Sequence, residues 1–112
     1  MPKIILKGIP ASPGRVTGKV KIIDPSRTIP KFSGQDIIVS SFLTPPFVAL
    51  IKKNPAILGI ITDGGGATCH AAIVARELRI PYIAGAIVAT KKLRNNAEIT
   101  TDSAQGLVYE ES

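Results

Sequence analysis

Three consecutive glycines at positions 64–66 stand between an apolar run and a helical pattern, and this order constrains the fold more than any other stretch. The run at residues 57–61 is apolar apart from Gly59, which is typical of a central strand covered on both faces. Apolar residues then recur at helical spacing over residues 71–78. The sequence therefore predicts a strand, a glycine loop and a helix in succession, with the loop at the carboxyl end of the strand.

The predicted helix over residues 71–78 has a single apolar stripe. Its members stand at i, i+3, i+4 and i+7, and they are Ala71, Val74, Ala75 and Leu78. We expect Val74 and Leu78 to be buried against the strand at residues 57–61. Thr68 precedes the stripe and is the expected N-cap of the helix.

His70, the only histidine, would then lie in the first turn of this helix. Free backbone N–H groups and the positive end of the helix dipole favour an anion at such a position. The preceding glycines allow the backbone to approach a bulky anion closely. Because neutral imidazole is nucleophilic at physiological pH, this arrangement suits a histidine that carries a phosphoryl group on a ring nitrogen.

Residues 65–78, continued by Ile80, Pro81 and Gly85, closely resemble the phosphohistidine signature of phosphoenolpyruvate-utilising enzymes. That family includes phosphoenolpyruvate synthase, pyruvate phosphate dikinase and enzyme I of the sugar phosphotransferase system. Residues 8–20 resemble the opening of the same mobile domain, and residues 102–108 resemble its end. The likeness covers nearly the whole chain, so we interpret residues 1–112 as a single phosphohistidine domain of the swivelling type.

The resemblance implies that His70 is the catalytic residue, transiently phosphorylated on its tele nitrogen. The residues expected to bind the phosphate are Gly64, Gly65, Gly66, Thr68 and Cys69. In the dikinase and synthase branches, the threonine two before the histidine is also a regulatory phosphorylation site, which leaves two roles open for Thr68. No metal site is predicted, because Cys69, His70 and Asp63 lack a second ligand pair at the usual spacing.

The rest of the chain alternates strand and helix patterns. Strands are predicted at residues 3–7, 16–23, 37–40, 57–61, 81–84, 97–101 and 107–109. A second helix is predicted to start at Pro45, with Thr44 as its cap, and residues 10–14 are expected to form a rigid turn. These elements predict an α/β fold with a parallel-centred sheet, helices on one face and a second antiparallel β layer formed by the terminal strands. The three-layer β/β/α order is implied by the resemblance.

Two positions depart from the family pattern. Arg79 stands where many relatives have glycine after the helix, so we expect the helix to end with some left-handed strain or with another geometry. Asn95 and Asn96 replace the usual Asp-Gly turn, and the turn should persist because asparagine tolerates positive φ.

Composition limits the class of protein. The chain is 45% hydrophobic, enough to fill a core, and it shows neither a membrane-spanning run nor a signal peptide, so we predict a cytoplasmic protein without membrane association. The lone cysteine agrees with a reducing compartment. The net charge of +6 has two interpretations, a solvated surface of scattered Lys and Arg or attraction to an anionic partner. Nucleic acid is not an expected partner, because aromatic residues are not interleaved with the basic ones.

Family members join this domain to an ATP-grasp nucleotide-binding domain and to a barrel that binds phosphoenolpyruvate or pyruvate. Neither fits within 112 residues. We therefore expect these partners on separate subunits, or the chain to be an excised piece of a larger enzyme; the early start of the domain after Met1 favours the first. No cofactor is expected on this domain itself, and Mg²⁺ with ATP or phosphoenolpyruvate is expected on the partners.

Two functions follow. In the first, His70 accepts a phosphoryl group from a partner that binds ATP or phosphoenolpyruvate and passes it to an acceptor such as pyruvate. The chain would then be a phosphotransferase component, inactive without its partner domains. In the second, the domain is a non-catalytic regulatory module that binds a phosphometabolite at the glycine loop. Retention of His70 within an intact loop favours the first. The sequence leaves the donor, the acceptor and the oligomeric state open.

Overall fold

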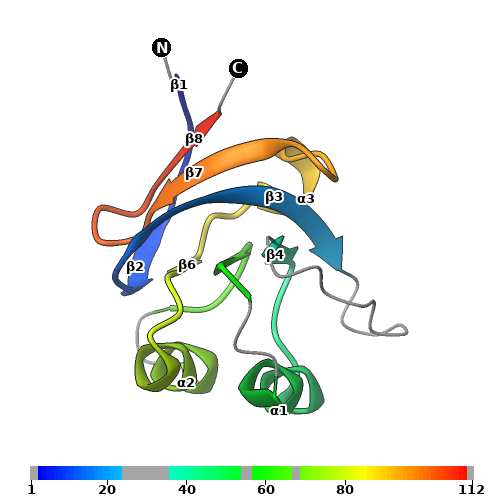
Figure 1. Cartoon of the computed structure of the whole chain (residues 1–112), viewed down its shortest axis with the longest axis vertical. Coiled ribbons are helices and arrows are strands. Elements are labelled where there is room, and N and C mark those ends of the chain that lie inside the picture. The colour runs from blue at the N-terminus through cyan, green and yellow to red at the C-terminus, as the bar shows by residue number, and fades with distance from the viewer. Residues whose placement is uncertain (1–2, 24–35, 54–56, 67–68, 111–112) are drawn as a thin grey trace.

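The computed structural model describes residues 3–23, 36–53, 57–66 and 69–110. Within these ranges eight strands form one hydrogen-bonded sheet in the order β1-β8-β7-β3-β4-β5-β6-β2 (Figure 1). The strands are β1 (Lys3–Lys7), β2 (Ile9–Ser12), β3 (Arg15–Ile23), β4 (Asp36–Ser40), β5 (Gly59–Thr62), β6 (Tyr82–Ala84), β7 (Glu98–Asp102) and β8 (Leu107–Glu110). The helices are α1 (Pro45–Lys53), α2 (His70–Leu78) and α3 (Ala89–Lys92).

The centre of the sheet is parallel, as predicted. Strands β3, β4, β5 and β6 pair in parallel, while β1, β7 and β8 pair with their neighbours in antiparallel fashion. Every residue of β4 and of β5 is buried, which is why both read as continuous apolar runs rather than as alternating patterns.

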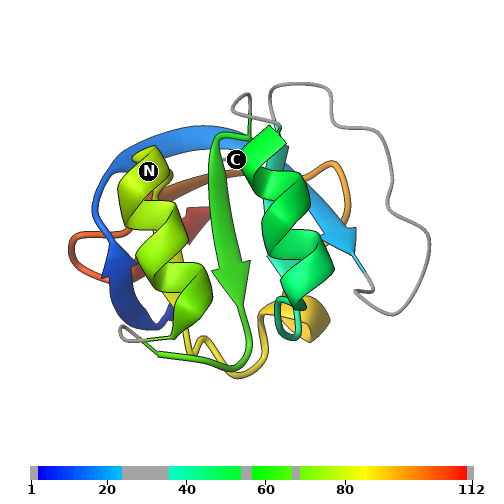
Figure 2. The same cartoon turned by 90° about the horizontal axis from the view of Figure 1, so that it is seen from below.

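Helices α1 and α2 lie side by side against one face of this parallel centre (Figures 1 and 2). The buried residues form two clusters, because successive strand residues point to opposite faces. On β4, Ile38 belongs to the cluster with α1 and α2, whereas Ile37 and Val39 belong to the other. This second cluster also contains residues of β1, β7, β8 and α3, so the sheet curves around it.

The terminal strands were expected to form a separate antiparallel layer. They are hydrogen-bonded into the same sheet, with β7 beside β3 and β8 between β7 and β1. The turn predicted at residues 10–14 is wrong for residues 10–12, which belong to strand β2; this strand pairs antiparallel with β6 at the sheet edge. Pro10 hid this strand from sequence analysis; an edge position tolerates proline, whose missing N–H needs no partner there.

The start of α1 agrees with prediction. The Thr44 hydroxyl accepts a hydrogen bond from the Phe47 amide at 3.3 Å, and Pro45 occupies the first helical position. The Asn95–Asn96 turn also persists, with Asn96 at φ 68°. The loop predicted at residues 24–34 lies outside the described residues.

The predicted burial of α2 is correct for Val74 but wrong for Leu78, whose side chain is 37% exposed. The buried residues of this helix are Ala72, Val74 and Ala75, because α2 packs against β2, β6 and α1 rather than against the middle of β5. The chain reverses directly after Leu78. As a result Ile80, and not Leu78, enters the cluster beneath the helices.

Arg79 causes this reversal. It adopts the left-handed conformation, φ 58° and ψ 39°, which confirms the strain expected at this position. Its amide donates to the carbonyl of Arg76, and the Ile80 amide donates to the carbonyl of Ala75 at 2.8 Å. This is the Schellman geometry, in which glycine is the usual residue.

Replacing Arg79 with glycine should therefore stabilise the protein. Glycine adopts left-handed angles without the Cβ penalty, so Arg79→Gly should raise the free energy of unfolding by about 1 kcal/mol. Glu77→Gly, on the exposed side of the same helix, should instead lower it by about 1 kcal/mol. Urea denaturation of the three proteins compares these values, and a destabilised Arg79→Gly variant would contradict the strain argument.

Candidate functional site

The site forms where β5 ends and α2 begins. Cys69 is the N-cap residue of α2, with φ −68° and ψ 159°, and its side chain makes no capping hydrogen bond. Thr68, the predicted N-cap and a predicted phosphate ligand, lies outside the described residues. His70 is the first residue of the helix and is exposed, so its ring lies in the first turn as predicted.

Backbone hydrogen bonds fix the first part of the glycine loop. The Gly64 amide donates to the carbonyl of Ser41 at 3.0 Å. The Gly64 carbonyl accepts from the Gly85 amide at 3.1 Å and from the Thr62 hydroxyl at 2.7 Å. The amide of Gly64 is thus already engaged within the protein, and it would have to leave Ser41 to bind a phosphate.

Asp63 connects this loop to α3. Its carboxylate accepts hydrogen bonds from the Thr90 amide at 3.0 Å and from the Thr90 hydroxyl at 2.5 Å. Its carbonyl accepts from the Ile87 amide at 2.9 Å. Asp63 therefore holds the segment after β6 against the segment after β5. Across the described ranges no three His, Cys, Asp or Glu side chains gather closely enough to hold a metal ion.

Gly65 and Gly66 differ in what they require. Gly65 has φ +88°, and a Cβ there would lie 3.5 Å from the Tyr82 hydroxyl and 3.7 Å from the Cys69 sulfur. A Cβ on Gly66 would have no atom of the described residues outside its chain neighbours within 4 Å. Gly65 is therefore needed for its conformation, whereas Gly66 leaves open space directly before the helix.

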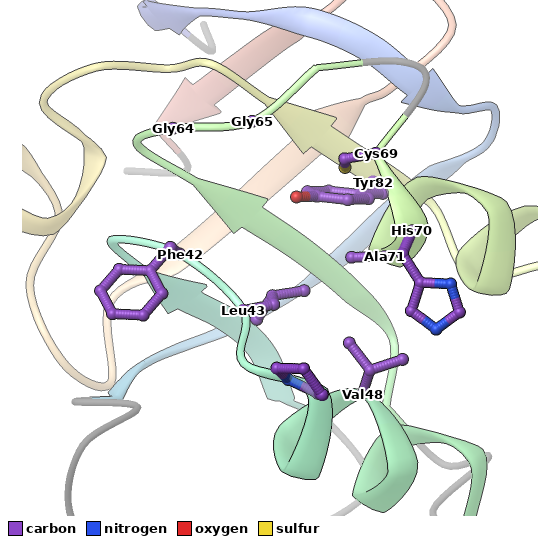
Figure 3. A pocket seen from close by; sticks show the side chains of 10 residues that line it. Phe42, Leu43, Val48, Gly64, Gly65, Cys69, His70, Ala71 and Tyr82 are labelled. Carbon is purple, nitrogen blue, oxygen red and sulfur yellow. The ribbon is translucent and has the colours of Figure 1, made fainter.

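A cavity of about 180 Å³ adjoins the loop (Figure 3). It is lined mainly by apolar groups, from Phe42, Leu43, Pro45, Val48, Gly64, Gly65, Cys69, His70, Ala71 and Tyr82. Cys69 and Tyr82 lie together at its inner end, and the His70 ring extends on the side of Val48 (Figure 3). Sequence analysis missed Tyr82, Phe42 and Val48, because each reads as an ordinary strand, loop or helix residue.

The environment of Cys69 favours its thiolate. Burial raises the pKa of the thiol, whereas the backbone of Gly66 and Ala72 lowers it. The hydroxyl of Tyr82 and the backbone of Ala71 act in the same direction, so the pKa of Cys69 lies below its ordinary value. Burial raises the pKa of Tyr82 to about 12, so its hydroxyl stays protonated at neutral pH.

Comparison with known proteins identifies the family. Residues 32–106 match the family described as PEP-utilising enzyme, mobile domain. Over 108 residues, the chain is 48% identical to a protein of Archaeoglobus fulgidus named probable phosphoenolpyruvate synthase. That match covers 96% of this chain but only 14% of the relative. The chain therefore belongs to the mobile-domain family of PEP-utilising enzymes, and it spans about one seventh of the length of this relative.

Two solved structures support the fold. A solution structure of enzyme I matches 65% of this chain and 29% of its own, with a TM-score of 0.57 and 36% identity. Thermococcus kodakaraensis aconitase X matches 96% of this chain and 98% of its own, with a TM-score of 0.73. At 22% identity, this second likeness shows the fold alone. No helix in the described part of the chain is long and apolar enough to cross a membrane.

The two loop glycines give a matched test of this geometry. Gly65→Ala should lower the free energy of unfolding by about 1–2 kcal/mol, because a Cβ is strained at positive φ. Gly66→Ala should change it by less than about 0.5 kcal/mol, since the space around it is open. Equal stability losses in urea denaturation would show that the loop conformation differs from the one described.

Proposed function

We propose that this chain is a phosphoryl-carrier domain in which the imidazole of His70 is transiently phosphorylated. The observation that carries the proposal is the exposed ring of His70 at the N-terminus of α2, beside the open space at Gly66. Membership of the mobile-domain family and likeness to a named phosphoenolpyruvate synthase support it.

The chemistry follows from the residue and its position. The neutral tele nitrogen of His70 attacks the phosphorus of the donor, an N–P bond forms, and the bond from phosphorus to the donor oxygen breaks. The amides of the loop and the first turn, with the helix dipole, favour the negative charge of the phosphoryl group. Gly65, Gly66 and Thr68 are the proposed phosphate-binding residues. Gly64 and Cys69, whose amides donate to the carbonyls of Ser41 and Gly66, chiefly shape the loop, so Cys69 is proposed to bind the phosphate only if its amide is released. In the second transfer a protonated imidazole is the leaving group.

The donor and acceptor belong to other domains. We propose that an ATP-grasp domain holding Mg²⁺ and ATP phosphorylates His70, and that a barrel domain binding pyruvate or phosphoenolpyruvate exchanges the group. The much greater length of the relative supports such partners. Buried clusters lie on both faces of the single sheet, and we propose that the domain swivels as a unit to carry His70 between the partners.

A regulatory module that only binds a phosphometabolite has less support. Such a module needs the loop amides but not an exposed imidazole beside them. His70 is exposed at the rim of the cavity rather than buried in a structural role.

Labelling of His70 tests the proposal. The purified chain is mixed with ATP, Mg²⁺ and the Archaeoglobus fulgidus relative from which the matching 108 residues have been deleted. Intact mass spectrometry should then show one added phosphoryl group, labile in acid and stable in base, because protonation makes the ring a leaving group. His70→Ala should abolish the label and change the free energy of unfolding by less than about 0.5 kcal/mol, since the side chain is exposed. Label on Cys69, on a hydroxyl or on His70→Ala would contradict the carrier assignment.

The open space at Gly66 gives a second test in the same assay. Gly66→Ala should slow labelling by roughly tenfold, because the added methyl group occupies space that the phosphoryl group would use and misplaces it. Ala71→Gly serves as a control for a one-methyl change nearby that adds no bulk. An unchanged labelling rate in Gly66→Ala would show that the phosphoryl group does not approach the loop at this residue.

A further inference from the structure

We propose that Tyr82 is a positioning residue for transfer at His70: its hydroxyl links the glycine loop to the N-cap of α2 from beneath. The inference rests on the proposed function of His70 and extends it to a buried residue that does not touch the phosphoryl group. Its experiment therefore includes one measurement that requires no phosphoryl transfer.

Hydrogen-bond donors and acceptors define a direction for this link. The Thr62 hydroxyl donates its single proton to the Gly64 carbonyl at 2.7 Å. The Thr62 and Tyr82 oxygens lie 2.8 Å apart, and because the Thr62 proton is already used, Tyr82 must be the donor. The Tyr82 oxygen keeps an acceptor site, and the neighbouring thiol of Cys69 is a donor when it is neutral.

Together these groups form the inferred relay, which runs from Cys69, whose pKa Tyr82 lowers, through Tyr82 and Thr62 to the carbonyl of Gly64. A Cβ on Gly65 would meet the Tyr82 oxygen, the Cys69 sulfur and the Thr62 oxygen, all between 3.5 and 3.8 Å, so the three groups converge behind this one residue. In Figure 3, Cys69 lies directly beside the Tyr82 ring.

Burial makes the relay strong. Tyr82 is 2% exposed and Thr62 is fully buried, so water cannot replace a lost hydrogen bond. One end of the relay is the Gly64 carbonyl, at the start of the loop. The other end is Cys69, the residue directly before His70. A single phenol hydroxyl thus fixes both ends of the segment that the phosphoryl group must approach.

The ring of Tyr82 also packs in the cluster beneath the helices, so a purely structural role must be distinguished from a positioning role. The ring and the hydroxyl can be separated by experiment. Tyr82→Phe keeps the ring and removes only the oxygen, and Thr62→Val breaks the same relay one step further along. Thr62→Ser removes a buried methyl group but keeps the hydroxyl, so it leaves the relay intact.

The chain supplies matched controls. Tyr109, the other tyrosine, lies on β8 with Arg15 over its ring at 5.5 Å, away from the loop, so Tyr109→Phe removes the same atom elsewhere. Thr101 has a buried hydroxyl without a hydrogen-bond partner. Thr101→Val therefore removes a buried hydroxyl without changing any hydrogen bond of the relay.

The first measurement is the rate of His70 phosphorylation by phosphoramidate, a small donor that requires no partner protein. Tyr82→Phe and Thr62→Val should each be roughly tenfold slower than wild type, because the loop loses its fixed geometry. The double variant should be no slower than either single variant, since the two residues act in one chain. Thr62→Ser, Tyr109→Phe and Thr101→Val should react at the wild-type rate.

The second measurement is the pH dependence of Cys69 alkylation by iodoacetamide, which is independent of phosphorylation. Tyr82→Phe should move the midpoint to higher pH. Once the thiol ionises it can no longer donate to Tyr82, and the phenol turns its proton from Thr62 to the sulfur, which lowers the pKa of Cys69 in the wild-type protein. Tyr109→Phe should leave the midpoint unchanged.

A wild-type phosphorylation rate and an unchanged alkylation midpoint in Tyr82→Phe would overturn the proposal. The proposal would also be overturned if Thr101→Val slowed phosphorylation of His70 as much as Tyr82→Phe does for the same loss of stability, since that pattern is expected of a purely structural residue. If wild-type His70 accepts no phosphoryl group, the proposed function fails and the transfer role of Tyr82 fails with it. In that case a shifted midpoint in Tyr82→Phe still shows that the phenol holds Cys69, which separates the two failures.

Discussion

The peptide group of Gly64 is the constraint on which the rest of the site depends. Its amide donates to Ser41, and its carbonyl accepts from Gly85 and from the Thr62 hydroxyl. A residue held at both its amide and its carbonyl cannot rotate freely, so the loop leaves β5 in one direction. Because Thr62 is fully buried, water offers no substitute for its bond. Everything that follows along the chain, including the position of His70, starts from this fixed group.

Parallel pairing explains why the partners of Gly64 are within reach. Strands β4, β5 and β6 run in the same direction, so their carboxyl ends lie along one edge of the sheet. This is the edge at which the strands end, and not the side formed by the outermost strand. The segments that follow these strands then bond to one another, as the Asp63 amide does to Ser40 and the Ala86 amide to Thr62. Helix α2 begins from this edge, which leaves His70 exposed above a fixed base. The proposed carrier role needs this combination, since the histidine would have to be reached by other domains yet keep its geometry.

Features set by neighbouring residues could be predicted from the sequence. The order of strand, loop and helix, the cap at Thr44 and the strain at Arg79 each depend on a few adjacent side chains. The buried face of α2 could not be predicted, because it depends on which strands lie beneath the helix, and β2 was hidden by its proline. Tyr82 was missed for the same reason: its partners Thr62 and Cys69 are distant in sequence and meet only after the sheet has formed.

Residues with positive φ gather at the edge that presents His70. Gly65, Gly85 and Ile87 all have positive φ there, and Ile87 is β-branched and 77% exposed. For Ile87 this conformation costs roughly 1–3 kcal/mol, whereas glycine adopts it freely, and packing cannot offset the cost because the Ile87 side chain contacts mainly water. Hydrogen bonds must do so instead, and the Ile87 amide does donate to Asp63, whose carboxylate holds Thr90. The described residues at this edge are therefore held by hydrogen bonds to the segments beside them, which gives the proposed phosphoryl site a fixed base.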